Sequence, residues 1–229
     1  MKKYYTLIIL IIIICRCSAQ ETIPKKNRLT ETITEYFNVL KDSDQVKEGE
    51  YRAFYLKNVI IARGKYTNNQ KTGVWYFYDT HQQTVQIFNY TENKLLYEEP
   101  VNHKSLQYVQ YLFDRKFADS DQVTKPIRIG GRSYGYLPYL KFFQLSDDYD
   151  YWDQYYYTIL ELLISPGGRL ADVKIHIKTS GSDRVTTFSP DIFSEEDKQF
   201  IPATLNGEPI LSRIFLELRV TDKGTLDIY

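Results

Sequence analysis

The fold class is decided by residues 71–79, which read KTGVWYFYD, and by the earlier segment that they repeat. A repeat at one fixed period is typical of a structure built from copies of one supersecondary unit. The sequence therefore predicts a repetitive β-sheet in the first half of the chain. A shift of 24 positions aligns Gly49 with Gly73, Tyr51 with Trp75, Phe54 with Tyr78, Tyr66 with Tyr90, Thr67 with Thr91 and Asn69 with Asn93.

Each repeat unit is predicted to form two short strands, at residues 50–55 and 59–66 in the first copy. Lys57-Asn58 and Thr67-Asn68-Asn69 are expected to form the turns, because asparagine and glycine tolerate the backbone angles of tight turns. Glycine supplies positive φ angles, and aromatic rings cover a sheet face that is too thin for a deep core.

Residues 30–40, upstream of the repeat, fit two patterns. Ile33, Phe37 and Leu40 have the spacing of a helix face, whereas EYFNV at residues 35–39 is typical of a strand. We favour a strand that opens the sheet.

Residues 64–66 and 71–79 resemble the MORN-type repeat, and more closely its variant in bacterial envelope proteins and in the antitoxin repeat family. The resemblance covers two units, residues 48–97. It implies an elongated antiparallel sheet that serves as a scaffold or contact surface. We assign the repeat domain to residues 30–99.

The aromatic residues of this repeat allow a second hypothesis, in which they bind envelope glycan or peptide by stacking. Aromatic rings that cover a thin sheet are more often its own packing, and we favour that interpretation. The candidate stacking residues are Trp75, Tyr76, Tyr78 and Tyr90.

The second half of the chain shows a β-hairpin. Residues 157–164 are predicted to be a strand that runs into the turn Ser165-Pro166-Gly167-Gly168. Val173, Ile175 and Ile177 then alternate with polar residues, which is typical of a half-buried strand.

A short helix is predicted at residues 190–199, with Ser189 or Ser194 as its cap, and a last strand at residues 212–220. Residues 134–143 look partly helical, and residues 100–124 are interpreted as a connection. The order is therefore strand, strand, helix, strand, and the predicted class is α+β, predominantly β.

Residues 125–229 resemble the C-terminal domain of TonB-type energy transducers. The resemblance rests on Gly130-Gly131, on GRLADV at residues 168–173 and on FIPATLNGEPI at residues 200–210, where Phe200 replaces the usual Trp. It implies a contact with an envelope protein or peptide and a link to TonB-type transport. Because the chain has eight prolines and no long linker, we interpret the domain as a contact module rather than a transducer.

The last strand is the predicted contact site. At a sheet edge its free N–H and C=O groups would pair with an extended peptide by β-strand addition. The alternatives are that the strand is interior or that its charged side chains block the edge, and the residues do not decide between them. Preference for a partner would be set by Arg213, Phe215, Glu217 and Arg219.

Residues 1–19 have the pattern of a secretory signal: Lys2 and Lys3, an apolar run at residues 7–14, and a cleavage site after Ala19. The run is too short to span a bilayer, so we favour a processed leader over a membrane anchor. Acylation of Cys15 or Cys17 is the minority alternative. We expect an exported protein, in the periplasm or associated with the outer membrane of a Gram-negative-type bacterium.

Composition argues against several function classes. The chain holds 29 basic and 29 acidic residues, and this balance disfavours electrostatic binding of nucleic acid. Both cysteines lie in the leader, so disulfides and thiol chemistry are not expected in the mature chain. We expect a non-enzymatic protein without a cofactor.

A metal site is not expected either. His81, His103 and His176 each lack a second ligand at metal spacing. The acidic run lacks the glycine and distal glutamate of a calcium loop, and we interpret it as a solvated loop rather than a Ca²⁺ site. Its members are Asp147, Asp148, Asp150 and Asp153.

Overall fold

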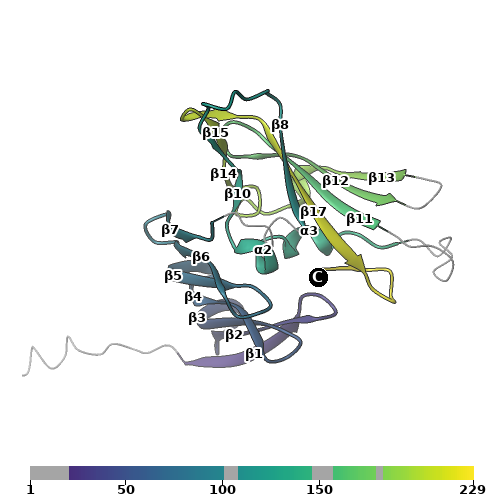
Figure 1. Ribbon diagram of the computed structural model, residues 1–229. Coiled ribbons are helices and arrows are strands. Elements are labelled where there is room, and N and C mark those ends of the chain that lie inside the picture. The colour runs from purple at the N-terminus through teal and green to yellow at the C-terminus, as the bar shows by residue number, and fades with distance from the viewer. Residues whose placement is uncertain (1–20, 101–107, 146–156, 179–182) are drawn as a thin grey trace, which may run out of the picture.

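The protein is predominantly β, as predicted, and consists of two large antiparallel sheets with short helices between them (Figure 1). The computed structural model describes residues 21–100, 108–145, 157–178 and 183–229. The predicted leader, His103 and the acidic run lie outside these ranges.

The first sheet is a seven-stranded meander in which each strand pairs with the next. The strand favoured for residues 30–40 is confirmed as β2. The sheet begins before residue 30, because β1 pairs with residues 34–40 of β2. Its strands are β1 (Thr22–Arg28), β2 (Ile33–Leu40), β3 (Ser43–Tyr55), β4 (Val59–Thr67), β5 (Gln70–Tyr78), β6 (Thr84–Asn89) and β7 (Lys94–Glu98).

The turn residues of the repeat have the expected positive φ angles. Asn68 and Asn69, between β4 and β5, have φ of 49° and 66°, and the aligned Gly49 and Gly73 have 87° and 64°. The turn after β3 is one residue earlier than predicted: its left-handed residues are Leu56 and Lys57. Local backbone chemistry therefore determines most of this meander.

One face of the first sheet carries a continuous aromatic cluster. Tyr51 and Trp75, which the repeat aligns, are buried with ring centroids 5.1 Å apart. Tyr66 lies 5.4 Å from Tyr51 and 5.3 Å from Trp75, and Tyr90 lies 5.6 Å from Trp75. The repeat thus forms the core of the sheet.

The second sheet contains the predicted hairpin of β11 (Tyr157–Ile164) and β12 (Leu170–Lys178). In its turn the N–H of Ser165 donates to the carbonyl of Arg169 at 2.9 Å, and Gly168 has a φ of 70°. The strand order is β13-β12-β11-β17-β18, and β8 also pairs with β17. The further strands are β8 (Val109–Phe113), β13 (Asp183–Phe188), β17 (Ser212–Val220) and β18 (Leu226–Asp227).

The helix predicted at residues 190–199 is wrong. Only a 3-10 turn, η1 (Pro190–Ile192), forms there, and it is followed by a second turn. Both candidate caps are used: Ser189 Oγ accepts the N–H of Asp191, and Ser194 Oγ accepts the N–H of Asp197, each at 3.2 Å. Two caps so close together begin two short turns instead of one helix.

The predicted order of strand, strand, helix, strand is therefore corrected. Strand β13 follows the hairpin, and short strands replace the helix before β17. The segment interpreted as a connection supplies β8 and β9 (Val123–Thr124) to the C-terminal sheets. The remaining strands are β10 (Ile127–Arg128), β14 (Phe200–Ile201), β15 (Ala203–Leu205) and β16 (Glu208–Ile210).

Two short helices, α2 (Gly131–Tyr134) and α3 (Leu137–Leu140), lie between the large sheets (Figure 1) and account for the partly helical segment. Gly131 has a φ of 64°, and a Cβ there would lie 2.7 Å from Val85 of β6. The N–H of Gly130 donates to the buried side-chain oxygen of Gln86 at 2.6 Å. The Gly-Gly pair thus lets α2 pack closely on the first sheet.

Candidate functional site

Strand β17, the predicted contact strand, has neighbours on both sides. Residues 158–164 of β11 pair with one side, and β8 and β18 pair with the other. Strand addition at residues 212–220 is therefore wrong. The alternation of β17 indicates which face is buried, but it carries no information about how many strands flank it.

The four residues predicted on β17 nevertheless share one face of the sheet, the outer face, and all are half-buried. Arg213 Nε donates to Glu161 Oε1 at 3.0 Å, and Arg219 lies 3.5 Å from the carboxylate of Asp227. Phe215 and Glu217 instead line a groove of about 200 Å³ on this face. The groove is completed by Tyr108, Gln110, Tyr157, Ile159 and Lys178.

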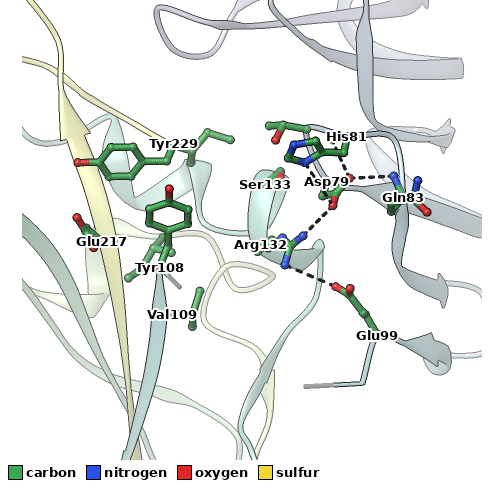
Figure 2. A pocket seen from close by; sticks show the side chains of 13 residues that line it. Asp79, His81, Gln83, Glu99, Tyr108, Val109, Arg132, Ser133, Glu217 and Tyr229 are labelled. Carbon is green, nitrogen blue, oxygen red and sulfur yellow. Dashed lines mark hydrogen bonds and ion pairs between the residues drawn. The ribbon is translucent and has the colours of Figure 1, made fainter. Parts of the chain in front are cut away.

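The groove meets a larger cleft of about 690 Å³ between the two sheets, because Tyr108 and Glu217 line both. Figure 2 shows Tyr108, Tyr229 and Glu217 on one wall and the residues around Asp79 on the other. Other lining residues come from elements of both sheets, so the cleft exists only because the sheets are packed together.

The wall around Asp79 is an ion-pair network set on the turn between β5 and β6 (Figure 2). Asp79 Oδ1 accepts the N–H groups of His81 and Gln83 at 2.9 and 2.8 Å, and Asp79 Oδ2 accepts from Arg132 at 2.7 Å. Arg132 also lies 3.6 Å from Glu99. His81 lies in a turn as predicted, with an exposed ring. These contacts fix Asp79 and Arg132 in place.

Within the described residues, β13 lies at one edge of the second sheet. This strand pairs with β12 on one side, and no second neighbour is found among the residues that the structure describes. Five of its six residues are exposed, and Val185 is 50% exposed. The β1 edge differs, because it carries Pro24, Lys25 and Lys26.

The candidate stacking residues do not form one surface. Trp75 is fully buried, and its Nε1 donates to the carbonyl of Lys65 at 3.2 Å. Tyr76 and Tyr78 lie on the opposite face of β5, where the guanidinium of Arg63 is 4.7 and 5.8 Å from their ring centroids. The interpretation of Trp75 as packing is confirmed, and the stacking site on these four residues is wrong.

Two lysines that sequence reasoning missed follow the same 24-residue period. Lys47 and Lys71 each place Nζ over the aligned aromatic residues of their own repeat unit, which is a cation–π arrangement. Burial raises the pKa of Tyr66 and Tyr90, so these rings stay neutral. The distances from Nζ to the ring centroids are 5.5 Å (Lys47–Tyr51), 5.2 Å (Lys47–Tyr66), 5.2 Å (Lys71–Trp75) and 5.3 Å (Lys71–Tyr90).

Each of these lysines also has an acidic partner. Lys47 Nζ lies 3.2 Å from Glu35, and Lys71 Nζ lies 2.5 Å from Glu196 in the C-terminal half. Both lysines are mostly buried, so their charges serve the packing of the repeat. Aligning lysines as well as aromatic residues at the 24-residue period would have found them.

His176 lies on the outer face of the second sheet, where its Nε2 is 2.7 Å from Glu161 Oε2. Within the described part of the chain, no group of three His, Cys, Asp or Glu side chains is placed to hold a metal ion. No helix in the same ranges is long and apolar enough to cross a membrane.

A scan against protein-family models, a search of curated proteins and a search of solved structures each found no match to this chain. The resemblances to the MORN-type repeat and to the TonB C-terminal domain thus stay predictions from the residues that carry them.

Proposed function

We propose that this protein is an exported, non-enzymatic interaction module of the cell envelope, which binds an extended segment of an envelope protein by β-strand addition. We place the addition at β13 instead of β17. Export is supported by the leader pattern of residues 1–19, and a role beside TonB-type transport is supported by the resemblance of residues 125–229.

The observation that carries this proposal is the exposed edge of β13. An edge strand presents a row of unpaired N–H and C=O groups, which is a template for another strand. Val185, Thr186 and Thr187 favour the extended conformation, and β13 contains no proline or lysine that would discourage pairing. The edge strand β1 carries both kinds of residue.

The neighbouring strand determines which side chains a bound segment would meet. Val185 pairs with His176 and Thr187 pairs with Lys174, so these side chains share the outer face of the sheet. A segment added to β13 would place alternate side chains beside Val185 and Thr187. Backbone pairing would supply affinity, and these positions would supply specificity.

The proposal is tested by site-specific photo-crosslinking of the full chain in its native envelope. A photoreactive amino acid is placed at Val185, and a matched control carries it at Ile23 on the β1 edge. Both positions are exposed strand residues. We expect a discrete crosslinked protein at Val185 and none at Ile23.

Proline substitutions at Thr186 and at Thr187, with the photoreactive amino acid kept at Val185, then separate strand addition from side-chain contact. Only alternate residues of an edge strand point their N–H away from the neighbouring strand. We expect proline to abolish the crosslink where it replaces a residue whose N–H points outward, while the circular dichroism spectrum stays that of the native protein. A crosslink that survives every proline, or an equal crosslink at Ile23, would contradict strand addition at β13.

A further inference from the structure

The groove and the cleft meet at a carboxylate, that of Glu217, surrounded by tyrosines. The N–H of Glu217 donates to the carbonyl of Tyr108 at 2.8 Å, so these two residues lie opposite each other on adjacent strands. Tyr108 and Tyr229 stack with ring centroids 4.9 Å apart and an interplanar angle of 12°. Figure 2 shows the three side chains on the same wall of the cleft.

The rings around Glu217 are accessible from outside. Tyr108, Tyr157 and Tyr229 are 38%, 40% and 44% exposed. Burial, and next the negative charge of Glu217, raise the pKa of both Tyr157 and Tyr229, which agrees with a carboxylate close to both rings. Aromatic faces next to a carboxylate are the surroundings that an organic cation prefers.

The charges along the cleft also favour a cation. The acidic residues of its lining are Asp79, Glu99 and Glu217, and the basic ones are Arg132 and His81. The adjoining groove adds Lys178, which lies 3.6 Å from Asp183. Arg132 is paired with Asp79 and Glu99. Lys178 and Arg219 pair with Asp183 and Asp227, and within the described ranges no basic side chain forms an ion pair with Glu217.

We propose that this site binds the cationic side chain of an arginine or lysine in a peptide partner. The charged group pairs with Glu217 and lies against the rings of Tyr108, Tyr157 and Tyr229. Arginine is preferred, because its planar guanidinium stacks on aromatic rings and pairs with a carboxylate through two N–H groups. Among the described residues, none that lines the groove or the cleft belongs to β13, so the site is distinct from the edge proposed for strand addition.

The test uses the full mature chain and two capped amino acids of matched shape. Nα-acetylargininamide carries the charge, and Nα-acetylcitrullinamide replaces the guanidinium with a neutral urea group. Binding is followed by amide chemical shifts in NMR titrations. We expect saturable millimolar binding of the arginine compound, centred on residues 108–110, 157–159 and 215–217, and at least about tenfold weaker binding of the citrulline compound.

Two variants assign the site. Glu217→Gln keeps the shape and removes the charge, and Tyr229→Leu removes one ring of the stack; each is expected to weaken binding at least about fivefold. Glu208→Gln, at an exposed position on β16, is the control and is expected to leave binding unchanged. Equal binding of the two compounds, an unaffected Glu217→Gln variant, or no saturable binding overturns the proposal.

A third compound separates a peptide from a free cation. A capped pentapeptide with a central arginine flanked by threonines is expected to bind at least about fivefold more tightly than the capped amino acid, because its neighbouring residues reach the groove beside Phe215 and Ile159. Equal affinity of the two would show a site for free cations and would overturn the assignment to a peptide partner.

Discussion

At the scale of single residues, the first sheet depends on two kinds of position. At one kind only a glycine fits, and at the other a buried tyrosine must keep its hydroxyl proton. Gly64 allows the indole of Trp75 to lie directly on β4, because a Cβ there would be 2.2 Å from the ring. The repeat predicted that Trp75 covers a face of the sheet. Its close contact with Gly64, however, depends on the pairing of β4 with β5. Such contacts between strands cannot be read from either segment alone.

Gly64→Ala is expected to destabilise the protein by about 2–3 kcal/mol, because the new methyl group displaces Trp75 from a filled core. Gly73→Ala is the matched control: its φ is positive, but no atom lies within 4 Å of the position that a Cβ would take, so about 1 kcal/mol is expected from backbone strain alone. Urea unfolding followed by circular dichroism measures both. A Gly64→Ala variant as stable as Gly73→Ala would contradict the close contact.

Stability is expected to fall as the pH rises past 10, the ordinary pKa of tyrosine. Burial raises the pKa of Tyr51 and Tyr134 well above that value, and their hydroxyl groups lie 2.9 Å apart. The unfolded chain then loses protons that the folded chain keeps, so the stabilisation is complete below pH 10 and is lost above it. Thermal unfolding between pH 8 and about pH 11 measures the decline, which Tyr134→Phe should make less steep.

At the scale of elements, local patterns predicted the strands of the repeat, the β11–β12 hairpin and β17, but they missed β8 and β13, and pairing between distant segments was not predictable. The turn at Gly167-Gly168 and the alternation of β12 follow from the properties of single residues. The position of β17 inside its sheet depends on β8, which is distant in sequence and short. The helix expected at residues 190–199 failed because two serine caps compete within one segment.

Gln110→Pro is expected to uncover the edge of β17. Gln110 is exposed and pairs with Phe215, so proline removes backbone pairing in β8 without removing a core side chain. We expect a loss of about 2 kcal/mol in stability and faster amide hydrogen exchange at residues 212–216. Gln110→Thr keeps the backbone N–H and is expected to behave like the natural protein. Unchanged exchange in the proline variant would show that β8 does not protect β17.

At the scale of the whole molecule, buried polar residues join the two sheets around a shared hydrophobic core. Arg128 is buried and donates to Gly135, Glu196 and Gln199 carbonyls, and it pairs with Asp197 at 2.8 Å. These contacts hold α2, α3 and the segment before β14 together. Their partners lie far apart in sequence, so no local pattern could have predicted how the sheets pack or where the cleft between them forms.

Substitution of Asp227 gives the most direct test of these polar contacts between the two sheets. Its carboxylate is fully buried in β18 and accepts from Thr30 Oγ1 at 2.7 Å and from the N–H and Oγ1 of Thr32 at 2.9 Å, all in the turn between β1 and β2. Asp227→Asn replaces one acceptor oxygen with a donor that faces other donors, so we expect a loss of about 2 kcal/mol and faster hydrogen exchange at Thr32 and Ile33. Asp222→Asn, at an exposed position nearby, should change stability by less than about 0.5 kcal/mol. If both variants unfold at the same urea concentration, the sheets are held together by their apolar core, and the contacts of Asp227 add nothing to it.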